Sequence, residues 1–139
     1  FSLRYFNVYG NRQPISGSYA LVIGKFINQI LNNAPLTING DGEQRRDFVC
    51  VEDVVEANMI CSSIKHNKDN ILNIGSGVNY SINELADLLC VSYPKLNNPP
   101  VIEPKETLAN IRRAKSIINW EPKINFTSWL SSYKKELKI

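Results

Sequence analysis

Two short segments carry polar side chains at positions where packing of the fold does not require them. In the first, Asn7 interrupts an otherwise apolar strand exit, where a side-chain amide can bind either turn backbone or an external polar group. In the second, a glycine-bearing turn leads into Arg45 and Arg46 at the start of a strand. A guanidinium there can hold a phosphate through two parallel hydrogen bonds. Residue types alone slightly favour the alternative, an ion pair of Arg46 with Asp47 or Asp53.

The cysteines and the single histidine do not indicate a metal site or a catalytic nucleophile. Cys50, Cys61 and Cys90 stand far apart in apolar surroundings, with no C-x-x-C pair, which predicts free and mostly buried thiols in a reducing compartment. His66 is the single histidine, and the polar run 65–70 around it predicts an exposed turn. We therefore expect no zinc site, no Ser-His-Asp triad and no catalytic residue in this chain.

A third segment, Gly75-Ser76-Gly77, follows an apolar run and precedes a predicted helix. This placement is shared with dinucleotide-binding loops, but the third glycine is missing and no acidic residue follows on a second strand. We therefore interpret the segment as a tight turn between a strand and a helix. No other segment has the pattern of a phosphate-binding loop.

The composition limits the class of protein. The chain has 139 residues, 43% of them hydrophobic and 21% charged, with a net charge of +3. These values predict one globular domain and exclude a collagen-like or disordered chain. The charge is too small to require a nucleic-acid partner, and every apolar run is far shorter than the roughly 20 residues that cross a bilayer. We expect a soluble, cytoplasmic protein with no membrane partner.

The elements that must position the polar residues alternate between strand and helix. Apolar spacing, turn residues and capping patterns predict strands at 3–9, 36–39, 47–51 and 71–74, and helices at 19–31, 53–65, 82–91, 109–118 and 126–137. Capping boxes are expected at Asp53 with Glu56 and at Ser81 with Glu84. Residues 97–100 are expected to be a linker, and Asn119 to adopt a left-handed conformation after a helix. The pattern predicts an α/β fold with no internal repeat and no second domain boundary.

Five motifs, in this order, resemble the C-terminal half of an extended short-chain dehydrogenase/reductase, of the NAD-dependent nucleotide-sugar epimerase and dehydratase family. They are RYFNVYG at 4–10 with Arg12-Gln13, YALVIGKF at 19–26, GDGEQ at 40–44 with RDF at 46–48 and VEDVV at 51–55, NIGSG at 73–77, and WEP at 120–122. The resemblance implies a Rossmann-type fold, represented here by its last sheet strands and its small substrate-binding subdomain. Residues 1–139 would form the substrate-binding half of the domain, without the N-terminal NAD-binding half.

The resemblance also implies roles for nine residues. Near the start of the chain, Tyr5 would lie by the nicotinamide of NAD, Phe6 beside the hexose, and Asn7 would hydrogen-bond the substrate diphosphate, which Arg46 would also clamp. The remaining five would contact the uridine: Leu21 and Val22 facing the uracil, Phe26 walling the same pocket, and Thr37 and Asn39 flanking the nucleoside. For Leu21, Val22 and Phe26, burial in a core explains the helical spacing equally well.

The family reaction removes a hydride from the sugar C4 to NAD and returns it to the opposite face, with a Tyr-x-x-x-Lys pair as base. By resemblance, that pair and the glycine-rich NAD fingerprint would lie upstream of Phe1, so we expect a fragment that is inactive alone. The segment at 19–26 favours a UDP-sugar 4-epimerase acting on UDP-glucose or UDP-N-acetylglucosamine, and family resemblance favours a homodimer. A 4,6-dehydratase or decarboxylase of the same family, and a non-catalytic interaction module, are the alternatives. Asn11 and Gly24 depart from the family pattern, which commonly has proline at both positions.

Overall fold

The computed structural model describes residues 1–65 and 70–139 as an α/β protein, so the turn predicted around His66 lies outside the described residues. The chain divides into two compact units, each built from three separate segments. The first unit contains Phe1–Gly10, Arg46–Asn79 and Thr107–Phe126, and the second contains Asn11–Arg45, Tyr80–Glu106 and Thr127–Ile139. The sequence predicted one domain without a boundary. Because the chain passes repeatedly between the units, no single linker marks the division.

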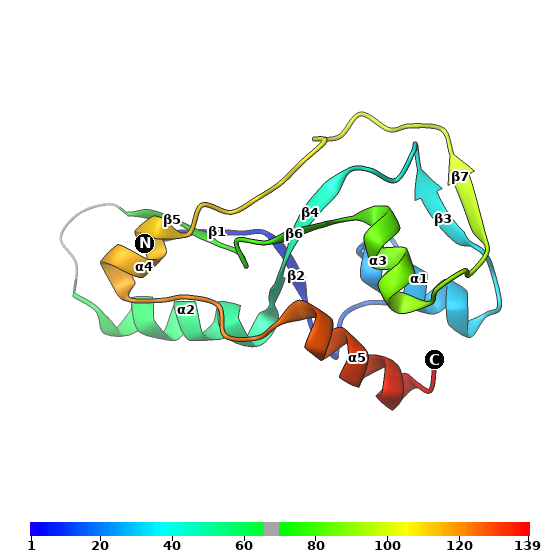
Figure 1. Ribbon diagram of the computed structural model, residues 1–139. Coiled ribbons are helices and arrows are strands. Elements are labelled where there is room, and N and C mark those ends of the chain that lie inside the picture. The colour runs from blue at the N-terminus through cyan, green and yellow to red at the C-terminus, as the bar shows by residue number, and fades with distance from the viewer. Residues whose placement is uncertain (66–69) are drawn as a thin grey trace. The chain divides into compact units, whose positions relative to one another are not determined.

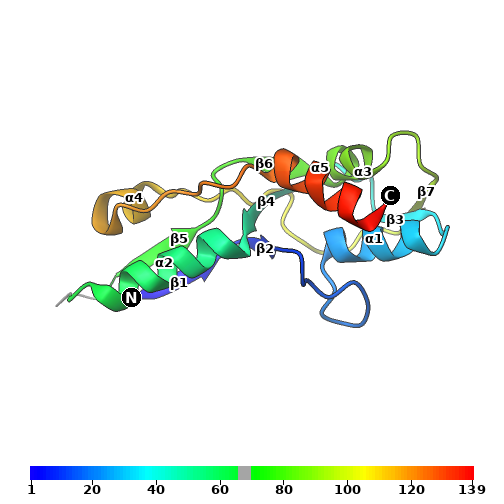
Figure 2. The same cartoon turned by 90° about the horizontal axis from the view of Figure 1, so that it is seen from below.

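Parallel strand pairs form the centre of the first unit (Figure 1). Strand β1 (Ser2–Tyr5) pairs with β5 (Ile71–Ile74), and β2 (Asn7–Tyr9) pairs with β4 (Arg45–Cys50), which has β6 (Asn79–Ser81) as its other neighbour. Helix α2 (Val51–Ser63) runs alongside these strands, and α4 (Arg112–Ile118) contacts both α2 and β5 (Figure 2).

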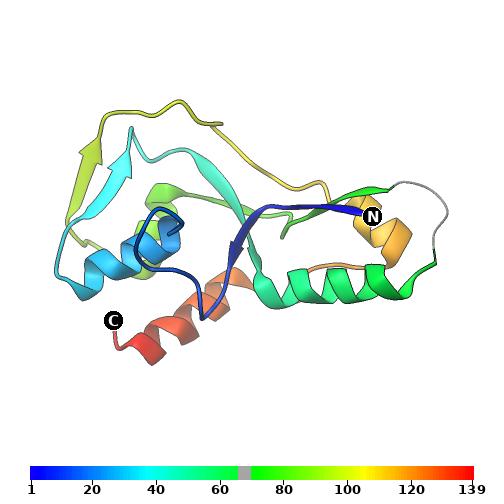
Figure 3. The ribbon, with the colours of Figure 1, turned by 180° about the vertical axis from the view of Figure 1, so that it is seen from behind.

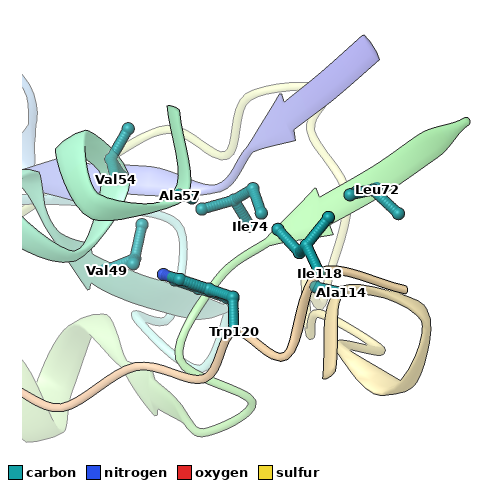
Figure 4. Packing of buried hydrophobic residues seen from close by; sticks show 8 residues of the cluster. All are labelled: Val49, Val54, Ala57, Leu72, Ile74, Ala114, Ile118 and Trp120. Atoms are coloured by element: carbon teal, nitrogen blue, oxygen red, sulfur yellow. The ribbon is translucent and has the colours of Figure 1, made fainter. Parts of the chain in front are cut away.

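The apolar core of the first unit draws on β4, β5, α2 and α4, with Leu3 of β1 and Val8 of β2 packed against it (Figure 4). Its buried members are Val49, Val54, Ala57, Leu72, Ile74, Ala114, Ile118 and Trp120. The indole of Trp120 is 1% exposed, and its Nε1–H donates to the Asp53 carbonyl oxygen at 3.0 Å. This bond satisfies the polar end of a buried aromatic side chain.

The second unit packs helices on a separate parallel pair, β3 (Leu36–Asn39) with β7 (Lys95–Asn98) (Figure 3). Helix α1 (Val22–Leu31) contacts β3 and α3 (Ile82–Leu89). Helix α5 (Phe126–Leu137) begins at the last residue of the first unit and continues in the second. Its buried residues, Phe126, Leu130 and Tyr133, recur at helical spacing as predicted.

Several element predictions are confirmed. The strands 36–39 and 71–74 and the helix 126–137 have the expected bounds. Ser81 accepts the Glu84 N–H at 3.0 Å, and the Glu84 carboxylate accepts the Ser81 N–H at 2.8 Å, which completes the capping box. Asn119 has φ 49° and ends α4 in the left-handed conformation.

The capping box predicted at Asp53 and Glu56 is wrong. Helix α2 already begins at Val51, and Asp53 lies buried within its first turn. Its carboxylate accepts the backbone N–H groups of Lys123 and Ile124, at 3.0 and 3.1 Å, instead of capping its own helix. The carboxylate oxygens that the local sequence pattern predicted as a helix cap therefore form tertiary hydrogen bonds instead.

Other differences concern the ends of elements. Helices α1 and α4 each begin three residues later than predicted, at Val22 and Arg112, and α3 ends at Leu89. Residues 97 and 98, predicted as linker, belong to β7, whose four residues are all exposed and lack an apolar pattern. Strand β6 has only three residues, too few for a periodic signal.

Candidate functional site

The strand predicted at 3–9 changes its partner at Phe6. The Phe6 N–H still donates to the Ile74 carbonyl of β5 at 3.0 Å, whereas Asn7 already lies opposite Phe48 of β4. In open parallel sheets, ligands bind at the carboxyl ends of strands where neighbouring connections diverge. Tyr5, Phe6 and Asn7 therefore occupy a suitable position for a binding site, which we call the branch point.

Asp47 of β4 fixes the loop beside the branch point. Its side chain is fully buried, and Oδ1 accepts the Ser76 N–H at 2.6 Å and the Ser76 hydroxyl at 2.7 Å. Oδ2 accepts the N–H groups of Gly77 at 2.9 Å and of Ala109 at 3.0 Å. Residues 75–77 thus connect β5 to the short strand β6, whereas the sequence predicted a tight turn leading from a strand directly into a helix. Sequence reasoning missed Asp47 as the anchor of this loop, although a carboxylate within an apolar strand was the available signal.

Gly75 places this loop close to its neighbours. A Cβ atom on Gly75 would lie 2.4 Å from the Ala109 Cβ and 3.2 Å from Cγ of Phe6. A side chain does not fit at that distance, so glycine allows the turn to approach Phe6. The phenyl ring, the turn and the Asp47 carboxylate thus belong to one packed cluster.

Arg46 precedes Asp47 on β4 and is 8% exposed. The sequence left open whether it pairs with Asp47 or Asp53. Both carboxylates accept backbone N–H groups, so neither depends on a guanidinium to stabilise its charge. Because successive side chains of a strand point to opposite faces, Arg46 and Asp47 are directed to different sides of β4.

Tyr5 is held by α2. Its hydroxyl donates to Oδ1 of Asn58 at 2.9 Å, and Nδ2 of Asn58 donates to the Val54 carbonyl at 2.7 Å. The amide is thereby fixed on its own helix and orients the phenol. Asn58 was not among the predicted site residues.

In the second unit, the start of α1 carries three predicted residues. Leu21 is the exposed N-cap without a side-chain cap, Val22 is partly buried, and Phe26 is 1% exposed. Phe26 therefore packs in the core of this unit, as its spacing alone suggested. A Cβ at Gly24 would lie 2.2 Å from the Pro14 carbonyl oxygen, so glycine lets the loop before α1 approach the helix.

The remaining predicted residues lie on β3. Thr37 is held by Gln29 of α1, whose Nε2 donates to the threonine hydroxyl at 2.7 Å and whose Oε1 accepts the Thr37 N–H at 3.2 Å. Asn39 lines a pocket of about 640 Å³ in this unit. Gln44 also lines it, and its Nε2 donates to the Asn39 carbonyl at 3.0 Å.

The predicted residues thus fall into two groups. Tyr5, Phe6, Asn7 and Arg46 belong to the first unit, around the β2–β4 strand pair and the branch point. Leu21, Val22, Phe26, Thr37 and Asn39 belong to the second unit, on α1 and β3, which contact each other.

Within residues 1–65 and 70–139, no group of three or more His, Cys, Asp or Glu side chains could hold a metal ion. In the same part of the chain, no helix combines the length and apolar character needed to cross a membrane. The three cysteines are free, and burial raises the pKa of the Cys50 and Cys61 thiols.

A family model described as the NAD dependent epimerase/dehydratase family matches residues 1–75. The chain belongs to this family. The match includes the branch point, Asp47 and Arg46, and it confirms the family resemblance of the motifs in this part of the chain.

Similar proteins in this family perform more than one reaction. A UDP-glucuronate 4-epimerase of Thermodesulfobacterium geofontis is 34% identical over 134 residues, covering 92% of this chain and 40% of that protein. A UDP-glucuronic acid decarboxylase 4 of Arabidopsis thaliana is 31% identical over 140 residues, covering 97% of this chain and 31% of that protein.

A solved structure confirms the fold. The UDP-glucose 4-epimerase of Thermotoga maritima, crystallised with UDP-glucose, matches with a TM-score of 0.85 and 32% identity. The match covers 99% of this chain and 46% of that one. The chain thus spans less than half the length of each of these three proteins.

The turn at 75–77 does not fit the pyrophosphate of NAD. A phosphate at a glycine-rich turn is held by backbone N–H groups, and here those of Ser76 and Gly77 already donate to Asp47. The buried carboxylate would also repel a phosphate at that place. Among the described residues, Tyr5 is the one for which the resemblance implies a cofactor contact.

Proposed function

We propose that this chain is the nucleotide-sugar-binding part of a UDP-sugar 4-epimerase acting on UDP-glucose or UDP-N-acetylglucosamine. The observation that carries the proposal is the agreement of almost the whole chain with an epimerase crystallised with UDP-glucose. The position of Phe6 and Asn7 at a strand branch point supports it, because such points are the usual binding places in this class of sheet.

The diphosphate would be bound by Asn7 and Arg46 from the neighbouring strands β2 and β4. A guanidinium matches two phosphate oxygens with parallel N–H groups. Because Arg46 is 8% exposed, its hydrogen bonds to an anion would form in a region of low dielectric and would be stronger than at the surface. Phe6 would contact the hexose beside this pair.

The uridine would be bound in the second unit. Leu21 and Val22 at the first turn of α1 would face the uracil, with Phe26 supporting the wall from within the core. Thr37 and Asn39 would flank the nucleoside from β3. The two hydrogen bonds from Gln29 hold Thr37 in one orientation, which lowers the entropy lost when a ligand binds.

The chain would bind substrate without turning it over. Tyr5 would contact NAD, but the turn at 75–77 does not accept its pyrophosphate, and we assign no catalytic residue. Assembly as a homodimer remains a prediction of the same resemblance, and a cytoplasmic location remains a prediction of the composition and the cysteines.

Calorimetric titration of the 139-residue chain with UDP tests the proposal. We expect binding that Arg46→Ala weakens at least tenfold and that Arg46→Lys restores only in part, because lysine keeps the charge without the planar pair of donors. Arg112→Ala removes the same charge from an exposed position on α4 and serves as the control. Equal UDP affinity of the wild-type and Arg46→Ala chains, both shown by circular dichroism to be folded, would overturn the assignment.

A nucleotide-sugar decarboxylase is the second candidate, since the decarboxylase relative matches 97% of the chain. Product identification with UDP-glucuronate and the protein that carries this chain separates the two reactions. A decarboxylase releases CO₂, whereas an epimerase preserves the carboxylate. A stable chain without any UDP affinity would instead favour a non-catalytic interaction module.

A further inference from the structure

Gln29 is the residue of α1 that joins this helix to β3. Val22, Phe26 and Gln29 are spaced by four and three residues, so they lie on one side of α1. Nε2 of Gln29 donates to the Thr37 hydroxyl at 2.7 Å, and its Oε1 accepts the Thr37 N–H at 3.2 Å. Both residues are partly buried. The side of α1 that the proposed function assigns to the uracil therefore continues directly into the Thr37 hydroxyl.

The backbone of β3 fixes which way round the Gln29 amide lies. Gly40, directly after β3, donates its N–H to the Asn98 carbonyl of β7 at 3.0 Å. The N–H groups of alternate strand residues point to opposite edges, so that of Thr37, three residues earlier, is directed away from β7. A backbone N–H only donates, so the Gln29 atom that faces it is the oxygen. The NH₂ group of the same amide then faces the Thr37 hydroxyl.

This orientation sets the direction of the hydrogen bonds of the Thr37 hydroxyl. The NH₂ group of Gln29 only donates, so the hydroxyl oxygen accepts and its hydrogen is excluded from that direction. Between described residues, no hydrogen bond takes up the hydroxyl hydrogen of Thr37. A threonine hydroxyl without such a neighbour rotates and presents either its hydrogen or a lone pair. Gln29 therefore leaves the hydrogen available to a ligand.

We propose that Gln29 is a positioning residue that sets the base specificity of the site, because it makes the Thr37 hydroxyl a donor to the group at C4 of a pyrimidine. This deepens the proposed function and rests on it, since the base must lie against α1 and β3. Uracil carries an acceptor oxygen at C4, whereas cytosine carries an amino group that donates. A site with a fixed donor at this place therefore favours uridine over cytidine nucleotides.

Gln29→Glu reverses the direction of this hydrogen bond with little change of shape. One carboxylate oxygen still accepts the Thr37 N–H, and the other accepts the hydroxyl hydrogen, so only lone pairs of the hydroxyl face the ligand. UDP and CDP carry the same diphosphate, so the added charge affects both and cancels in the ratio of their dissociation constants. Calorimetric titration of the 139-residue chain with each nucleotide, at about pH 8 where glutamate is ionised, measures this ratio.

We expect the wild-type chain to bind UDP about tenfold more tightly than CDP, and Gln29→Glu to reduce this preference about fivefold or more. Gln29→Met is a second variant, which keeps a good helix former and lets the hydroxyl rotate, so it should reduce the preference less. Asn28→Asp is the matched control. It makes the same change from amide to carboxylate on the adjacent residue of α1, whose Oδ1 accepts from Asn32 at 3.1 Å, and should leave the ratio unchanged.

Thr37→Val separates specificity from a merely structural role of Gln29. Valine keeps the branched shape without the hydroxyl, so we expect a weak base preference that added Gln29→Glu does not change further. If Gln29 only stabilised the fold, its variants would weaken UDP and CDP binding equally. An unchanged ratio for Gln29→Glu, in a chain that circular dichroism shows to be folded, would overturn this inference alone. A folded wild-type chain without UDP affinity would overturn the proposed function together with it.

Discussion

Arg46 and Asp47 are adjacent charged residues with different assignments. Asp47 is fully buried, and its two oxygens accept one hydroxyl and three backbone N–H groups, from Ser76, Gly77 and Ala109. This arrangement stabilises a carboxylate without a cation. Arg46 is assigned to substrate by family resemblance. The local sequence cannot distinguish these roles, because the partners of Asp47 lie 29 or more residues away.

Replacing Asp47 by alanine leaves three backbone donors without their acceptor. We expect Asp47→Ala to lower the free energy of unfolding by about 3 kcal/mol or more, because each unsatisfied buried donor costs about 1–3 kcal/mol. Urea denaturation followed by circular dichroism measures this change. Asp87→Ala breaks a surface ion pair with Lys95 and should cost less than about 1 kcal/mol. A loss for Asp47→Ala no larger than that of Asp87→Ala would contradict the anchoring role.

Helix α3 shows how a local signal succeeds at the level of an element. Ser81 and Glu84 bind each other's backbone N–H groups, and the box lies within four consecutive residues. The hydrogen bond from the Ser81 N–H holds the pKa of Glu84 below its usual value. Burial raises this pKa by less than the Ser81 bond lowers it, and Arg45 lowers it further. The charged form of Glu84 is thus favoured in the folded chain.

The capping box predicts a pH-dependent contribution to stability. Since folding lowers the pKa of Glu84, its contribution is complete above the unfolded value of about 4.3 and is lost as the pH falls through the folded value. Glu84→Gln has no titrating group here. We therefore expect the stability difference between wild type and Glu84→Gln, measured by urea denaturation, to shrink on acidification from about pH 6 to about pH 3. A difference that is constant over this range would contradict the linkage.

Removing the other arm of the box tests it independently of pH. We expect Ser81→Ala to cost about 1 kcal/mol, because the Glu84 N–H loses its acceptor. Ser131→Ala, at an exposed position within α5, should change stability by less than about 0.5 kcal/mol. Equal effects of the two substitutions in urea denaturation would show that the cap contributes nothing.

The sequence predicted the elements that depend on neighbouring residues. Helix α5 has a regular apolar face, and Asn119 has a side chain that suits the left-handed conformation. It failed where distant segments decide the outcome. Asp53 is bound by Lys123 and Ile124 instead of capping α2, and the strand at 3–9 breaks because β4 replaces β5 as its neighbour. For the site, the motifs implied which residues to consider. The contacts by which Asp47 and Asn58 support those residues join distant parts of the chain, so only the structure shows them.

At the scale of the whole molecule, the two units share one chain that passes between them repeatedly. Residues 11–45 and 80–106 of the second unit contain helices and strands of their own, and each segment is joined at both ends to a folded segment of the first unit. Unfolding of the first unit would release these four ends, so the second unit would lose more conformational entropy on folding, by an amount that grows slowly with the length of each closed segment. Stability is thus coupled through the connectivity of the chain alone.

The chain contains two tryptophans, Trp120 in the first unit and Trp129 in the second, so each unit carries its own fluorophore. In a Trp129→Phe background, emission reports the surroundings of the buried Trp120, and in a Trp120→Phe background it reports Trp129, whose Nε1–H donates to Asn11. We expect Asp47→Ala to shift the urea midpoint of both signals to lower concentration, that of Trp120 more strongly. A Trp129 midpoint that does not move would show that the two units unfold independently, and no external dye is needed to tell these outcomes apart.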